Sequence, residues 1–135
     1  MRTRFKLYFL EAIQSGCKNV VNFSGRASRS EYNYWLLFLL ILQISVIIID
    51  PPNPQVSRSY SDNPLNSRLF SFIYFVFIIP STSLVIRRFH DIGKSGWYVL
   101  LPFTIIGIVP YYYWTCFVIG EKKENAYGPN PLNNN

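Results

Sequence analysis

The chain has 135 residues, a length that suits one domain; half of them are hydrophobic and only 15% are charged, against about 25% in an average soluble domain. The hydrophobic residues form long uninterrupted blocks, which excludes an ordinary soluble domain and predicts an integral membrane protein. The formal net charge is +6, but the basic residues gather beside the apolar blocks. This placement favours membrane topology and anionic lipid headgroups and argues against nucleic acid as a partner.

The N-terminal segment, residues 4–22, is predicted to form an amphipathic helix that lies in the membrane interface. Phe5, Phe9, Ala12 and Ile13 recur at helical spacing, and basic residues stand among them. A soluble cap helix is the alternative. A signal peptide is excluded because the apolar residues are spread among charges and form no continuous apolar core.

Three apolar segments follow, at residues 32–49, 69–86 and 97–119, and each is predicted to be a transmembrane helix. Each segment has 18–23 residues, enough to cross a hydrocarbon core of about 30 Å at 1.5 Å per residue. A polar, proline-rich loop at residues 50–68 separates the first two, and residues 120–135 form a polar tail. The predicted fold is therefore all-α, a single membrane domain over residues 1–135.

The third segment allows more than one path. It contains Pro102, Gly107 and Pro110, and the aromatic block at residues 111–114 comes early for a membrane-interface belt on a helix that ends at Ile119. The helix is therefore tilted, or broken at Pro110, or the segment re-enters and returns to the side from which it came. A full crossing places the tail outside the cell, whereas a re-entrant path returns the tail to the inner side.

The orientation follows from the distribution of lysine and arginine. Residues 1–32 contain six basic residues and residues 87–96 contain three, whereas the 50–68 loop contains two. Because basic residues are enriched on the cytoplasmic side, we expect a multi-pass protein of the plasma membrane with a cytoplasmic N-terminus. The 87–96 turn is then also cytoplasmic.

This turn, RRFHDIGKSG, holds three cations, a carboxylate and the only histidine of the chain. Charge is costly in hydrocarbon, so the cluster marks a point where the chain reaches the membrane surface. A second group of charges precedes the first predicted span and is expected at the same level. Together they form the candidate binding site: Arg26, Arg29, Glu31, Arg87, Arg88, His90, Asp91 and Lys94.

Two interpretations of this cluster stay open. In the first, Glu31 and Asp91 pair with arginines of the other segment and hold the spans together at one face, with about 1 kcal/mol from each ion pair. In the second, the guanidinium groups form a pocket for a lipid phosphate, which arginine binds in a bidentate manner.

No catalytic residue, metal or cofactor is predicted. His90 and Asp91 are adjacent, and adjacent side chains on a helix point in different directions, so they do not form a triad with Ser95. Cys17 and Cys116 are isolated thiols without the spacing of a zinc site or a disulfide framework. The glycine-bearing turn at residues 93–96 lacks the preceding frame of a phosphate-binding loop.

Three motifs carry a resemblance to a known family: FSGRASRSEY at residues 23–32, RRFHDIGKSGW at 87–97 and NAYGPNP at 125–131. In this order they resemble domain of unknown function 805, the YhaH-like small bacterial inner-membrane proteins. The resemblance runs from about Phe5 to Leu132, with departures at Phe89, Asn33 and Asn130. It implies an inner-membrane location and a helical architecture, and no established activity.

The functional hypothesis is a non-enzymatic component of the bacterial inner membrane. Its expected partners are the lipid bilayer, anionic lipids bound by the Arg/His/Asp cluster, and a second copy or another membrane protein. A subunit of a homo-oligomeric channel or transporter is the alternative, because three prolines interrupt the spans. A membrane enzyme that uses His90 and Asp91 is the less favoured alternative.

Overall fold

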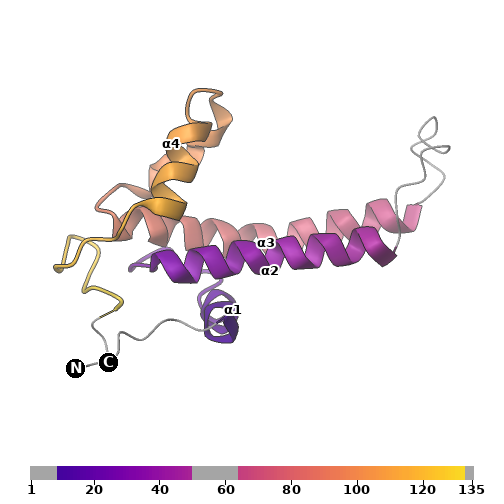
Figure 1. The fold of residues 1–135 in the computed structure, drawn as a ribbon, viewed down its shortest axis with the longest axis horizontal. Helices are drawn as coiled ribbons and strands as arrows, with labels where there is room; N and C mark the ends of the chain where they lie inside the picture. The colour runs from indigo at the N-terminus through magenta and orange to yellow at the C-terminus, as the bar shows by residue number, and fades with distance from the viewer. Residues whose placement is uncertain (1–8, 50–63, 133–135) are drawn as a thin grey trace.

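The computed structural model describes residues 9–49 and 64–132 (Figure 1). The described part of the chain is helical and contains no strand, so the all-α prediction is confirmed. Its elements are α1 (Phe9–Lys18), α2 (Arg29–Ile49), α3 (Pro64–Asp91), η1 (Gly96–Phe103), α4 (Ile108–Tyr112) and η2 (Tyr113–Phe117).

The helices α2 and α3 form a long antiparallel pair that runs side by side (Figure 1). Ser28 caps α2, because its side-chain oxygen accepts a hydrogen bond from the Glu31 amide at 3.2 Å. Arg29–Ile48 and Ser71–Asp91 are each long and apolar enough to cross a membrane. The predicted spans 32–49 and 69–86 each lie within one of these helices.

The boundaries of α3 correct two predictions. The helix begins at Pro64, inside the predicted 50–68 loop, and the rest of that loop lies outside the described residues. Proline suits the first turn of a helix, because the amide hydrogen that it lacks has no partner there. At its other end α3 continues through Arg87 and Arg88 to Asp91, so half of the predicted 87–96 turn is helical.

The third apolar segment is not one helix. The chain runs out along η1, turns at residues 104–107 and returns along α4 and η2. Eight residues of 3₁₀ helix reach about 16 Å at 2.0 Å per residue, and the ten returning residues reach about 15 Å at 1.5 Å per residue. Each leg is half the thickness of a hydrocarbon core, so the prediction of a single spanning helix over 97–119 is wrong. The end of the second leg lies back beside α3, where the Thr115 carbonyl accepts from Arg88 Nε at 2.9 Å.

The turn of this hairpin (residues 96–117) depends on Gly107 and Thr104. Thr104 Oγ1 donates to the Leu101 carbonyl at 2.8 Å and accepts from the Gly107 amide at 3.1 Å. A Cβ atom at residue 107 would lie 2.2 Å from the Leu101 carbonyl oxygen, so this close approach requires glycine. Pro102 and Pro110 further disfavour a continuous α-helix here.

The remaining elements gather at one end of the α2–α3 pair. The hairpin projects steeply away from that end, and α1 is seen end-on beside α2, so its axis crosses the axis of the pair (Figure 1). The tail returns to the same end, where the Glu121 amide donates to the Asp91 carbonyl at 2.9 Å. Helix α1 lies within the predicted 4–22 helix; residues 4–8 of that prediction lie outside the described residues.

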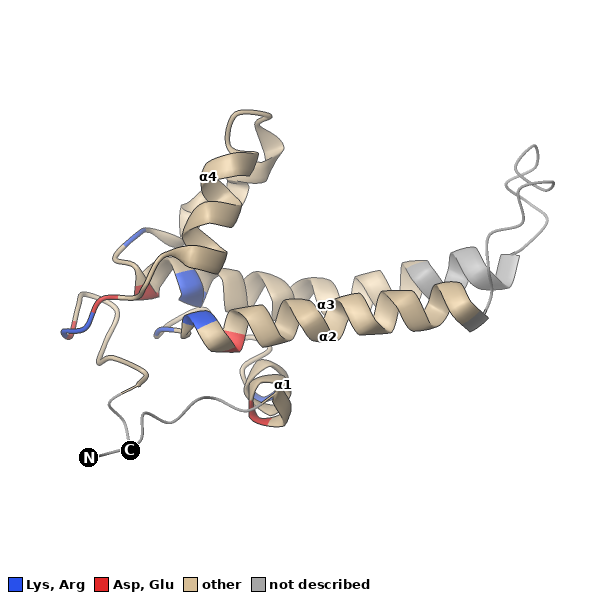
Figure 2. Cartoon of the chain, in the orientation of Figure 1, with Lys and Arg blue, Asp and Glu red and all other residues tan. Residues whose placement is uncertain are grey.

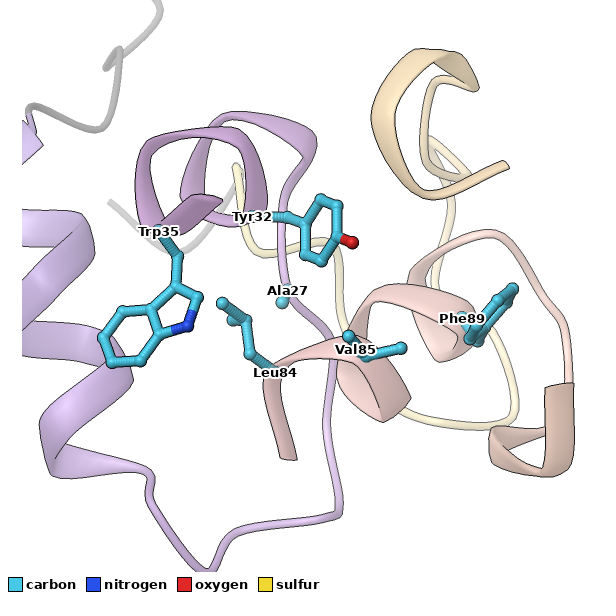
Figure 3. Close-up of a cluster of buried hydrophobic side chains, with 6 residues drawn as sticks. All are labelled: Ala27, Tyr32, Trp35, Leu84, Val85 and Phe89. Carbon is cyan, nitrogen blue, oxygen red and sulfur yellow. The ribbon is translucent and has the colours of Figure 1, made fainter. Parts of the chain in front are cut away.

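The core lies at this end too, and Figure 3 shows its six buried side chains: Ala27, Tyr32, Trp35, Leu84, Val85 and Phe89. Trp35 anchors it, because its indole nitrogen donates to the Ser81 hydroxyl at 3.0 Å and its ring packs on Phe77. Gly16 lets α1 approach closely, since a Cβ there would lie 2.5 Å from Trp35 Cζ3. Farther along α2 and α3, large apolar side chains are exposed, as expected of surfaces that contact lipid.

Candidate functional site

Asp91, the last residue of α3, binds two arginines from different segments. Its Oδ1 atom accepts from Arg26 Nε at 3.0 Å and lies 2.9 Å from Arg26 Nη2 in an ion pair, and its Oδ2 atom accepts from Arg88 Nη1 at 2.7 Å. The three side chains are at most 4% exposed. A buried carboxylate that is shared by two guanidinium groups satisfies the requirement that buried charges be paired.

The remaining donors of Arg26 bind the backbone of the tail. Its Nη1 atom donates to the Lys123 carbonyl at 2.8 Å and to the Gly128 carbonyl at 3.2 Å, and Nη2 donates to the Glu121 carbonyl. These hydrogen bonds fix the path of the tail near Asp91. A Cβ atom at Gly120 would lie 1.9 Å from Asp91 Oδ2, so glycine is needed where the tail passes the carboxylate.

Arg88 performs the same task for the hairpin. Its Nε atom donates to the Thr115 carbonyl at 2.9 Å, and Nη2 donates to the Val118 carbonyl. These carbonyls belong to the end of the returning leg, where a helix leaves its last carbonyls without backbone partners and carries partial negative charge. Arg88 thus caps the hairpin and joins it to Asp91.

Glu31 and Arg87 form a second, looser pair. Glu31 Oε1 accepts from the Ser15 hydroxyl at 2.7 Å and from Arg87 Nη1 at 3.4 Å, so it links α1, α2 and α3. Arg87 is 4% exposed, yet its Nε and Nη2 atoms have no hydrogen-bond partner among the residues that the structure describes. The carbonyl of Arg87 accepts from the Ala27 amide at 3.0 Å, which fixes the approach of the chain to α2.

The other predicted members of the site stand outside these two pairs. The His90 ring stacks on Tyr127 with 3.8 Å between centroids, and its Nδ1 atom lies 3.2 Å from the Gly25 carbonyl, so Nδ1 carries the proton. Lys94 Nζ lies 4.1 Å from the Trp114 ring centre, a cation–π contact. Arg29 is exposed and donates to the Phe117 carbonyl at 3.2 Å.

The residues that line the pocket differ from those that form the two ion-paired groups. A shallow pocket of about 570 Å³ is lined by residues 21–25, His90, Ala126 and Tyr127, and none of these carries a full charge when His90 is neutral. Within residues 9–49 and 64–132, no three His, Cys, Asp or Glu side chains gather closely enough to hold a metal ion. The guanidinium groups of Arg26 and Arg88 already donate to Asp91 and to backbone carbonyls. They therefore form no open pocket for a phosphate group.

Residues 20–129 match the family model described as Protein of unknown function (DUF805). The chain belongs to this family. It is 32% identical over 125 residues to Inner membrane protein YhaI of Escherichia coli (strain K12), which covers 84% of this chain and 89% of that protein. It is 28% identical over 119 residues to Inner membrane protein YhaH of the same strain, which covers 84% and 90%. No solved structure matches the chain.

The resemblance predicted from the motifs is thereby confirmed, and the chain is a bacterial inner-membrane protein. The structure also brings the three motifs of this DUF805 chain together. The first supplies Arg26, the second Arg88 and Asp91, and the third Asn125, whose side chain donates to the His90 carbonyl at 2.9 Å. The third motif itself was the feature of the sequence that could have linked the tail to the site.

Sequence reasoning missed the residues that act through the backbone or through their small size. These are Gly120, the carbonyl groups of the tail and hairpin that bind Arg26 and Arg88, and Ser15 of α1. Tyr127 was also missed, although it lies within the third motif. A sequence shows side-chain charges, but it does not show which carbonyls a guanidinium will meet.

Proposed function

We propose that this protein spans the inner membrane twice, with its N-terminus and tail in the cytoplasm, and binds anionic phospholipid headgroups as a non-enzymatic membrane component. In this proposal α2 and α3 cross the bilayer. The buried arginines hold the cytoplasmic end together, and exposed cations around them contact the lipid headgroups.

The observation that carries the proposal is the position of the charges. Figure 2 shows the coloured lysines and arginines toward the end of the α2–α3 pair where α2 begins. Among the residues of α2 and α3, the far part of the pair carries one charged residue, Arg68. Basic residues favour the cytoplasmic side, where anionic headgroups give the membrane surface a negative potential. The tail lies at the same end, because Arg26 binds its carbonyls.

In this proposal the exposed cations, and not the buried arginines, bind the lipid headgroups. Arg26, Arg87 and Arg88 are at most 8% exposed. The exposed cations among the described residues are Lys18, Arg29, Lys122 and Lys123. At about 1 kcal/mol for each basic residue near an anionic surface, these four supply up to about 4 kcal/mol, and the neighbouring Glu121 and Glu124 reduce that sum.

Two elements are suited to the membrane interface. The hairpin exposes Phe103, Ile105 and Ile106 at its turn, each by more than 85%, which fits burial at the boundary between headgroups and acyl chains. Helix α1 crosses the axis of α2 and α3 (Figure 1), the direction expected of a helix that lies flat on the membrane that they span. Trp97, exposed by 79%, adds an interfacial aromatic side chain.

The contacts of Asp91 and His90 also support a non-enzymatic role. A general base of the serine-hydrolase type needs a histidine that a carboxylate orients. Here the Asp91 carboxylate is bound by two arginines, and the histidine Nδ1 atom faces the Gly25 carbonyl. These contacts give Asp91 and His90 a structural role in the fold.

Lipid binding is tested on purified protein by counting the anionic and zwitterionic phospholipids that remain bound in native mass spectrometry. We expect Lys122→Gln with Lys123→Gln to lose bound phosphatidylglycerol, and the matched variant Glu121→Gln with Glu124→Gln to retain or gain it. An unchanged complement of anionic lipid in the lysine variant would refute the proposal.

Topology is tested by attaching a membrane-impermeant maleimide to Asn130→Cys in a Cys17→Ser, Cys116→Ser background. We expect labelling in inside-out vesicles and protection in intact spheroplasts. Labelling from the outer face would refute a cytoplasmic tail.

A further inference from the structure

We infer that this protein associates with a second copy of itself through a strip of α2 centred on Gln43. The inference rests on the proposed crossing of the membrane by α2. At 1.5 Å per residue, Gln43 lies about 4 Å along the helix from the midpoint of residues 32–49, deep within the hydrocarbon core.

Gln43 is the unusual residue of this span. Its side chain is exposed, and it makes no hydrogen bond within the part of the chain that the structure describes. A primary amide has two donors and an acceptor with two lone pairs. Lipid tails offer no partner for any of them, so an amide left facing hydrocarbon is costly.

The residues around Gln43 form a continuous strip: Leu40, Gln43 and Ile47, with spacings of three and four. An average spacing of 3.5 residues is the pattern by which one helix packs along another. Leu40 and Ile47 are 53% and 42% exposed. Helix α3 does not cover this strip, because the α2 side chains that meet α3 are on a different face, with Trp35 against Ser81 and Phe38 against Phe77.

A second copy is the occupant that fits Gln43. An amide is self-complementary, since its NH₂ group can donate to the carbonyl of an identical amide while its own carbonyl accepts in return. A two-fold axis through the strip places the two Gln43 side chains opposite each other at equal depth. Hydrogen bonds of this kind between helices are among the forces that hold membrane helices together. Another partner would need its own polar group at that depth.

The hairpin of the same chain leaves the strip open. It contacts α2 near the charged end, where Asn33 donates to the Cys116 carbonyl at 3.3 Å. From there it projects away from the helix pair (Figure 1). Gln43 lies ten residues farther along α2, about 15 Å from that contact.

Cross-linking in native membranes tests the surface. Single cysteines are introduced in a Cys17→Ser, Cys116→Ser background: Leu40→Cys and Ile47→Cys on the strip, and Leu37→Cys and Ile41→Cys as controls on another face of α2. We expect oxidation to give a product of twice the monomer mass at positions 40 and 47, several-fold more than at 37 and 41. Equal yields at all four positions, no dimer, or a product with a different partner mass would overturn the inference.

The role of the amide is tested by dilution of fluorescently labelled protein in liposomes. Gln43→Leu is apolar and occupies an exposed position, so the fold is kept, and we expect it to weaken dimerisation about three- to thirtyfold. Gln43→Asn, which keeps the amide, should retain most of the association. An unchanged dimer in Gln43→Leu would overturn the inference. Strip cross-links combined with a tail labelled from outside would refute the proposed topology and leave the dimer standing.

Discussion

Substitution of Asp91 by asparagine removes the one negative charge that two buried arginines share. The asparagine side chain has the same size as that of aspartate and keeps one acceptor oxygen. It leaves Arg26 and Arg88 without a counter-charge while both remain buried. Removal of one partner from a buried ion pair costs about 3–5 kcal/mol. Hydrogen bonds to charged groups contribute about 1.5–3 kcal/mol each, so the loss for two partners falls in the same range.

We therefore expect Asp91→Asn to lower the free energy of unfolding by about 3–5 kcal/mol, a large part of the roughly 5–15 kcal/mol that a protein of ordinary stability has. The measurement is reversible unfolding of the purified protein in mixed micelles. Because Arg26 holds the Lys123 carbonyl, trypsin should also cleave the tail of the variant faster. Glu124→Gln removes an exposed carboxylate and serves as the charge-matched control for the unfolding experiment.

The result that would refute this reasoning is a loss of 1 kcal/mol or less, the range of an exposed ion pair. It would mean that water reaches the carboxylate and that the network contributes little. Asp91→Glu separates charge from geometry. It restores the charge, but the longer side chain would press against Gly120, where the Asp91 carboxylate already leaves no space for a Cβ atom. We therefore expect a stability between those of the wild type and Asp91→Asn.

Five further substitutions test the packing and the buried arginines. Gly16→Ala should separate α1 from α2 and cost about 1–3 kcal/mol, because its Cβ would lie 2.5 Å from the Trp35 ring; indole fluorescence and unfolding report it. Trp35→Phe should cost about 1–3 kcal/mol by leaving the Ser81 hydroxyl without its donor. Gly107→Ala should disrupt the hairpin turn, which hydrogen exchange of the hairpin amides would detect. Arg87→Met should cost less than Arg88→Met in the same unfolding assay, since two of the Arg87 nitrogens have no hydrogen-bond partner to lose within the described part of the chain.

The two long helices could be predicted because each depends on local properties. An unbroken apolar run of about 18 residues is sufficient to identify a candidate span, and the 32–49 and 69–86 segments satisfy this without any contact elsewhere. The continuation of α3 to Asp91 could not be predicted in the same way. Arg87 and Arg88 favour a surface position, and they remain helical because Glu31, Asp91 and the hairpin carbonyls bind them.

The charged cluster was predictable in its members and less so in its arrangement. Opposite charges at one membrane level suggested that Glu31 and Asp91 pair with arginines from the other segment, and the structure pairs them with Arg87 and Arg26. The sequence offered no means to separate the arginine that binds the tail from the one that binds the hairpin. That division depends on backbone carbonyls, whose positions follow only from the complete fold.

The path of residues 97–119 shows that non-local contacts can prevent a segment that is long enough to span a membrane from forming one helix. The segment has 23 residues and is apolar enough to cross a bilayer. Its prolines and Gly107 make a continuous helix costly, yet a kinked crossing helix tolerates such residues when neighbours satisfy the backbone. Here the neighbour is Arg88, which binds the carbonyls at the end of the returning leg. The charge of that arginine is balanced by Asp91, whose Oδ2 atom lies 2.7 Å from Arg88 Nη1. The charge cluster therefore stabilises the returning path and holds the tail beside the first and second motifs.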